Sequence, residues 1–222
     1  MPVKVLGQAK SRLAELAGPR RPALALALAS DTVSAVVKCP EVARVLVVTS
    51  DTVATAALSE LGACVEPDAP DRGLNDALAH GAAVAARLWP GSGIAALTAD
   101  LPALRPGELG AALGAAASAA RSPGAGAASF VADAAQVGTT MYAVAPWGDF
   151  SPRFGGSSRA RHAASGAREL SLEGVPGLRR DVDTPDDLRA AVALGAGART
   201  MALAGELLSE HEPTGHELSE RG

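Results

Sequence analysis

A strand–helix–strand order in the first third of the chain constrains the fold most strongly. Residues 43–51 form an apolar run that ends in polar residues, residues 52–62 form a helical segment stopped by glycine, and residues 63–66 form a second apolar run. A continuous apolar run indicates a strand that is buried on both faces. Two such strands joined through a helix require a right-handed crossover, so we expect a parallel sheet flanked by helices.

A third apolar run, Ile94–Ala99, leads directly into an acid, Asp100. Ligands of open α/β sheets bind beyond the carboxyl ends of the strands, so we expect Asp100 to face a ligand. The alternative is that Asp100 caps the helix expected at 105–120. Pro102 and Pro106 separate it from the body of that helix, which favours the functional interpretation.

Composition limits the classes of protein to be considered. The 222 residues fit one domain, 1–208, followed by a polar tail, 209–222, that we expect to be disordered. The net charge of −4 excludes a general nucleic-acid surface. No apolar run reaches the ~18 residues of a membrane span, and the Met1 end lacks a signal-peptide core. Cys39 and Cys64 form no metal-binding spacing, which indicates a cytoplasmic setting. The oligomeric state is left open.

Cations concentrate near the start of the chain. Lys4, Lys10, Arg12 and Arg20 lie within twenty residues, without a Walker A pattern. Spaced along a loop that enters a helix, they could hold a polyphosphate, because lysine offers a point charge and arginine a bidentate fork. The alternative is an ordinary solvated face.

Residues 152–162 combine glycines, serines and three arginines. Backbone N–H groups around glycines form an anion-binding concavity, and a following helix start reinforces it. We therefore expect an anion site here, the alternative being an arginine-rich surface loop. His162 could act as a general base, but phosphoryl transfer needs little such help, so we expect it to cap or pack.

A second acidic motif lies near the end of the chain. Asp181 and Asp183 flank Val182, so in an extended strand both carboxylates point to the same side. Together with Asp100 they form an all-oxygen set suited to Mg²⁺.

Two helix starts carry polar residues. Thr184 is expected to cap a helix that Pro185 opens, with Asp186 and Asp187 structural in its first turn. Asn75 is expected to cap the helix at 76–88. The alternative is that its amide faces the base or ribose of a nucleotide.

With these motifs in order, the chain resembles the guanylyltransferases of deazaflavin coenzyme (F-420) biosynthesis, which join a phosphorylated three-carbon acid to GMP. The resemblance covers nearly the whole chain. It rests on Val3-Lys4, Ala9-Lys10-Ser11-Arg12-Leu13, Gly73-Leu74-Asn75, Asp100-Leu101-Pro102, Gly138-Thr139-Thr140, Arg153-Phe154-Gly155 with Ser158, and Asp181-Val182-Asp183-Thr184-Pro185.

The resemblance implies a Rossmann-like nucleotidyltransferase fold with a mostly parallel sheet. It implies that phosphoenolpyruvate reacts with GTP to release pyrophosphate, with Mg²⁺ as cofactor. The residues it assigns are Lys10, Arg12 and Asp100 for catalysis, Asp100, Asp181 and Asp183 for the metal, Lys4, Lys10, Arg12 and Asn75 for the nucleotide, and Thr139 or Thr140, Gly155 and Ser158 for the acid.

Three alternatives remain, and two departures from the family pattern bear on them. The alternatives are 2-phospho-L-lactate as acceptor, a molybdenum-cofactor-type nucleotidyltransferase, and a non-catalytic nucleotide-binding module. Relatives carry an apolar strand before Val3-Lys4, so we expect a slot in the sheet or a true start upstream of Met1. The usual Asp-Arg pair is Asp133-Ala134 here, which removes a cation near the expected acid site.

Overall fold

The computed structural model describes the chain except residues 70–71, 123, 125 and 212–222, so most of the expected tail lies outside the described residues. The strands are β1 (Leu46–Val48), β2 (Cys64–Glu66), β3 (Ile94–Leu97), β4 (Ala128–Ala132), β5 (Thr139–Val144) and β6 (Arg168–Glu169). The α-helices are α1 (Ala14–Ala17), α2 (Arg21–Val37), α3 (Thr52–Glu60), α4 (Leu74–Leu88), α5 (Pro106–Ala120), α6 (Ser158–Ala164), α7 (Pro176–Arg179), α8 (Pro185–Ala193) and α9 (Ala198–Glu210).

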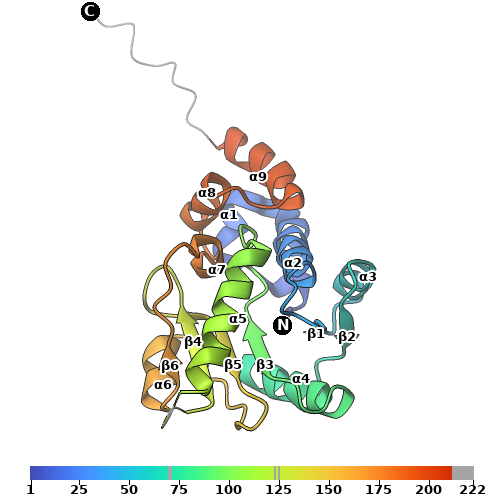
Figure 1. Ribbon diagram of the computed structural model, residues 1–222. Coiled ribbons are helices and arrows are strands. Elements are labelled where there is room, and N and C mark those ends of the chain that lie inside the picture. Colours follow the sequence, from blue (N-terminus) through green and yellow to red (C-terminus); the bar gives the residue numbers. More distant parts are fainter. Residues whose placement is uncertain (70–71, 123, 125, 212–222) are drawn as a thin grey trace, which may run out of the picture.

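The strands form two sheets, and the expected α/β class is confirmed (Figure 1). β1 and β2 pair in parallel, and a second sheet has the order β3-β5-β4-β6. β5 runs antiparallel to both of its neighbours, which differs from the mostly parallel sheet expected from sequence. The reason is the short connection at 133–138, because a parallel crossover needs a dozen or more residues.

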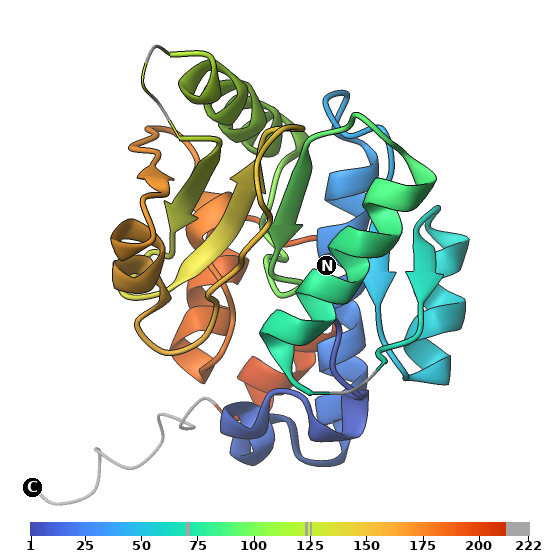
Figure 2. The same cartoon turned by 90° about the horizontal axis from the view of Figure 1, so that it is seen from below.

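Helices cover both faces of the larger sheet. Adjacent residues on β5 enter different cores, since side chains alternate along a strand. Met141 packs with α2 and α5, whereas Tyr142 packs with Leu78 of α4 and with Phe130. Figure 2 shows α4 crossing in front of the space between β3 and the β1–β2 pair.

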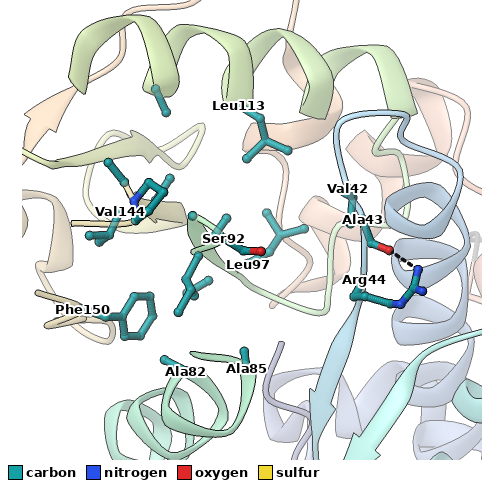
Figure 3. Close-up of a pocket in the computed structure, with 18 of the residues that line it drawn as sticks. Val42, Ala43, Arg44, Ala82, Ala85, Ser92, Leu97, Leu113, Val144 and Phe150 are labelled. Atoms are coloured by element: carbon teal, nitrogen blue, oxygen red, sulfur yellow. Dashed lines mark hydrogen bonds between the residues drawn. The ribbon is translucent and has the colours of Figure 1, made fainter. Parts of the chain in front are cut away.

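An apolar cleft of about 850 Å³ separates the two sheets (Figure 3). Its walls come from β1, β3, α4 and α5, and none of the site residues predicted from sequence lines it. The cleft lies between β1 and β3; the slot that the sequence analysis expects in the sheet stays a prediction. Met1 is among the residues that line it, and burial lowers the pKa of the Met1 amino group to about 5. Among the described helices, none is long and apolar enough to cross a membrane.

Candidate active site

The basic loop is fixed to the sheet at its start and to α2 further along. The Val48 amide donates to the carbonyl of Met1 at 2.9 Å, so the first residues run beside β1. Beyond them, the Leu6 amide donates to the Asp51 carboxylate at 2.9 Å. The Arg21 guanidinium donates to the carbonyls of Gly7, at 2.7 Å, and Ala9. These contacts hold the loop backbone immediately before Lys10.

Lys10 is the residue on which the acidic groups converge. Its backbone lies in the left-handed region with φ at 55°, a conformation that costs a non-glycine residue energy and is concentrated at functional sites. Its ammonium donates to the carboxylates of Asp100 and, at 2.9 Å, Asp183. The Lys10 side chain is only 13% exposed. The structure therefore brings together three predicted site residues from distant parts of the chain.

The two acidic motifs are joined through the backbone. The Val182 amide donates to the carbonyl of Asp100 at 3.1 Å, and the Val182 side chain is fully buried. Residues 181–183 form no strand, which corrects the sequence expectation. Because Val182 points into the core, Asp181 and Asp183 flank it on the opposite side, as expected.

The capping expectations have different outcomes. Thr184 caps α8 and accepts from the Asp187 amide, which confirms its structural role. Asp100 does not cap α5, whose N-cap is Arg105. Asn75 is not a helix cap either, because α4 begins one residue earlier, at Leu74.

The charges around Lys10 have opposite effects on two neighbouring carboxyl groups. Burial raises the pKa of Asp181 to about 7, helped by the negative charges of Asp100, Asp183 and Asp133. Burial by itself would also raise the pKa of Asp183. The positive charges of nearby Lys10, Arg12 and Lys4 outweigh burial and hold the pKa of Asp183 below the ordinary value. The three predicted triphosphate-binding cations thus all act electrostatically on one carboxylate.

The donor chemistry of this cluster fits a hard divalent cation. Among the described residues, Asp100 Oδ1 is buried and has no hydrogen-bond partner. The charges of Asp100 and Asp183 add to burial in raising the pKa of Asp181. A divalent cation would relieve both effects. Within the described residues, no three His, Cys, Asp or Glu side chains are already arranged to hold a metal ion. The ammonium of Lys10 provides the positive charge between Asp100 and Asp183 instead.

A second group of site residues lies where β4 turns into β5. The Asp133 carboxylate accepts from the amides of Val137, at 2.9 Å, and Gly138, at 2.7 Å. The β4–β5 register then shifts at Thr139, next to Thr140. Such a bulge re-aims side chains and is common beside active sites. The hydroxyl of Thr140 is buried and has no hydrogen-bond partner within the described chain.

We expect the substitution Gly138→Ala to disturb this turn. A Cβ atom at position 138 would lie 2.4 Å from the Asp133 carboxylate, so either the turn or Asp133 must move. Overpacking of this kind costs about 1–3 kcal/mol, measurable as a lower free energy of unfolding in urea. Gly114→Ala is the control, because it meets nothing within 4 Å in α5 and should be neutral or stabilising. An unchanged stability in Gly138→Ala would show that the turn is not held by Asp133.

The glycine-rich loop is held from two sides. The Asn75 side chain binds the backbone of Phe154 twice, accepting from its amide at 2.8 Å and donating to its carbonyl at 3.1 Å. Gly155 and Gly156 then adopt φ angles of 89° and 47°, which glycine alone takes readily. Within the described residues, the amides of Gly155, Gly156 and Ser157 donate no hydrogen bond, so they are free to meet an anion.

Sequence reasoning assigned no role in the site to three residues that shape it. Arg21 holds the basic loop, Asp133 holds the turn before Thr139, and His162 links that turn to the glycine-rich loop. Asp133 follows an apolar run directly and precedes Gly138 by five residues, a turn signal that could have indicated its role. The other two depend on contacts between distant segments. The amide of Asn75 is engaged with Phe154, so its predicted contact with a nucleotide stays a prediction.

The fold and the site together define a class of protein. A mixed α/β fold carries a lysine–carboxylate cluster built from the segments after β3 and before α8 and, on β5, hydroxyl groups beside a glycine-rich anion loop. This arrangement is compatible with the Rossmann-like nucleotidyltransferases.

Comparison with known proteins identifies the family. No protein-family model matches the chain. A phosphoenolpyruvate guanylyltransferase of Thermomonospora curvata is 62% identical over 207 residues, covering 93% of this chain and 88% of the relative. Proteins of the same name from Streptosporangium roseum and Streptomyces coelicolor are 55% and 54% identical, covering 91% and 94% of this chain and 88% and 95% of the relatives. The chain belongs to the family of the phosphoenolpyruvate guanylyltransferases.

Proposed function

We propose that this protein transfers the GMP moiety of GTP to phosphoenolpyruvate and releases pyrophosphate, as a step of coenzyme F-420 biosynthesis. The observation that carries the proposal is the convergence of Lys10 on Asp100, after β3, and Asp183, before α8. Relatives that carry the name of this activity match more than nine-tenths of the chain. The cations Lys4, Lys10 and Arg12 are the groups that would meet the triphosphate.

The acid is proposed to bind between β5 and the glycine-rich loop. The free amides of Gly155 and Gly156, the hydroxyls of Thr139 and Thr140 and the start of α6 at Ser158 supply hydrogen-bond donors there. Thr140 has an unpartnered buried hydroxyl, whereas Thr139 is already bound to His162. Both hydroxyls retain a proton to donate, so we assign both to the acid.

Mg²⁺ is proposed as the cofactor, held by Asp100 and Asp183 with Asp181 beside them. When bound, it would neutralise phosphate charge and polarise the α-phosphate. The orphaned Asp100 oxygen and the crowding of carboxylates around Asp181 support this assignment.

The chemistry requires positioning and charge neutralisation more than proton transfer. A phosphate oxygen of the acid forms the new bond to the α-phosphorus, and the bond from that phosphorus to pyrophosphate breaks. The attacking phosphate is already an anion near neutral pH, so no general base is needed. Lys10 and Arg12 offset the repulsion between two polyanions and the charge of the departing pyrophosphate.

The test is pyrophosphate release from GTP with phosphoenolpyruvate, in the wild type and in Asp100→Ala and Asp183→Ala. We expect each variant to lose at least about 100-fold in turnover, the scale of losing one electrostatic group in an active site. Asp186→Ala is the matched control, because it removes the same charge from a side chain that is 94% exposed.

Wild-type turnover in both Asp variants would contradict the assignment of the cluster. Repeating the assay with 2-phospho-L-lactate, and after chelation of Mg²⁺, distinguishes the acceptor and tests the metal. Calorimetric GTP binding without pyrophosphate release, whichever acid is supplied, would identify a non-catalytic nucleotide-binding module instead.

A further inference from the structure

His162 of α6 is a fully buried histidine at the centre of the proposed acid site. Its ring stacks on Tyr142 at a centroid distance of 4.7 Å and meets the edge of Phe154 at 5.3 Å. Both ring nitrogens have polar partners. Nδ1 lies 3.0 Å from the hydroxyl of Thr139, and Nε2 lies 2.9 Å from the amide of Arg153.

These two contacts determine where the ring proton lies. A backbone amide can only donate, so Nε2 must accept from Arg153 and cannot carry a proton. Burial, together with the charges of Arg161 and Arg153, lowers the pKa of His162 to about 4, so the ring is neutral at pH 7. The single proton therefore lies on Nδ1, where both the Thr139 oxygen and the backbone carbonyl of Ser158 are placed to accept it.

The hydroxyl of Thr139 is thereby left with a defined orientation. Its oxygen accepts from His162, so its own proton must point elsewhere, and within the described residues it has no second polar partner. The bulge between β4 and β5 explains how Thr139 reaches His162 at all. Thr139 and Tyr142 are three residues apart, so in a regular strand their side chains would lie on opposite faces. Both contact the ring of His162, because the bulge between them brings them to the same face.

We propose that His162 is a positioning residue for the phosphorylated acid, bridging Thr139 of β5 to the backbone of Arg153 so that the Thr139 proton and the amides of Gly155 and Gly156 are presented to the anion together. This inference rests on the proposed function. A preorganised donor set binds more tightly because its groups need not be ordered when the ligand arrives. Because both ring nitrogens are engaged in the interior, His162 is not available as a general base.

Two substitutions separate the two hydrogen bonds. His162→Asn places an amide near the Nδ1 position, so it keeps a donor for Thr139 and loses the acceptor for Arg153. His162→Gln reaches the Nε2 position, so it keeps the acceptor for Arg153 and loses the donor for Thr139. We expect each to raise the KM for phosphoenolpyruvate by about tenfold, which is the scale of losing one charge-assisted or buried hydrogen bond. The KM for GTP should change less than about twofold.

A double-mutant cycle distinguishes positioning from general destabilisation. Thr139→Val removes the hydroxyl and nearly preserves the shape. If His162 acts through Thr139, the two substitutions remove the same interaction. The double variant His162→Gln with Thr139→Val should then raise the KM for phosphoenolpyruvate no more than the more impaired of the two single variants does. Fully additive losses, or equal increases in KM for GTP and for the acid, would overturn the proposal.

Nuclear magnetic resonance of ¹⁵N-histidine-labelled protein supplies a readout independent of turnover. We expect His162 to show the Nδ1-protonated neutral form at pH 7, and its ring signals to move when phosphoenolpyruvate alone is added to the wild type. No movement in the wild type, or the opposite tautomer, would overturn the positioning role.

The two proposals fail in different ways. If the wild type turns over phosphoenolpyruvate and the His162 variants change only thermal stability, the positioning role is wrong and the proposed function stands. If the wild type binds phosphoenolpyruvate at His162 but releases no pyrophosphate, the proposed reaction is wrong and the positioning role stands.

Discussion

Replacing Lys10 with methionine is expected both to abolish turnover and to destabilise the fold by about 3 kcal/mol, the scale of removing one partner from a largely buried charge pair. Methionine keeps the apolar stem and the same left-handed backbone strain, so the change isolates the ammonium. Without the ammonium, no cation lies between the carboxylates of Asp100 and Asp183, and both also repel the carboxylate of Asp181. Turnover should fall at least about 100-fold, because the same ammonium is proposed to meet the triphosphate.

The measurement is urea unfolding followed in parallel with pyrophosphate release. Lys38→Met is the control, because Lys38 is an exposed cation at the end of α2 and should change stability by less than about 0.5 kcal/mol. In the Lys10→Met background, Asp183→Asn should recover part of the lost stability, since it removes one of the unpaired charges. Unaltered unfolding of Lys10→Met would show that the ammonium does not neutralise this cluster.

The two acidic segments of the site could be predicted from the sequence because their signals are local. The apolar run before Asp100, and the alternation of Asp181, Val182 and Asp183, depend only on neighbouring residues. The buried Val182 confirms that alternation. The contact between these motifs and Lys10 needs the resemblance or the structure, because no local pattern states which distant segments meet.

Other features could not be predicted because a local signal pointed to the wrong partner or was missing. Asn75 looks like a helix cap in sequence, yet its amide binds the backbone of Phe154. The antiparallel direction of β5 and the bulge at Thr139 depend on how the short 133–138 turn closes. Likewise His162 acquires its two hydrogen bonds only when α6 packs under β5 and the glycine-rich loop.

The carboxyl group of Asp181 leads to the second large expected effect. We expect Asp181→Asn to unfold at a higher temperature than the wild type near pH 8 and to lose turnover. A folded-state pKa of about 7, against an ordinary value of 3.8, means that above pH 7 the folded protein must keep this group ionised despite burial and the charges of Asp100 and Asp183. Converted in full, that pKa difference corresponds to a loss of about 4 kcal/mol in the free energy of unfolding. Because Asp181 is partly exposed, solvent screening reduces the expected loss to about 2 kcal/mol.

The pH dependence provides the check on the sign. The folded wild type binds the Asp181 proton more tightly than the unfolded chain, so this group costs stability progressively as the pH rises from about 4 to 7. The difference in unfolding free energy between Asp181→Asn and the wild type should therefore grow across that window and level off above it. Asp186→Asn, which removes a 94% exposed carboxylate, should show no such growth.

A gain in stability at the expense of activity would indicate that Asp181 is retained for its chemistry, because active sites keep groups that the fold would be more stable without. If Asp181→Asn is instead less stable than the wild type at pH 8, the carboxylate has a stabilising partner and does not bear the repulsion described. If it is more stable and fully active, the repulsion is real but Asp181 takes no part in holding Mg²⁺. Adding Mg²⁺ separates these outcomes further, since it should stabilise the wild type more than the variant only if the carboxylate helps to bind the ion.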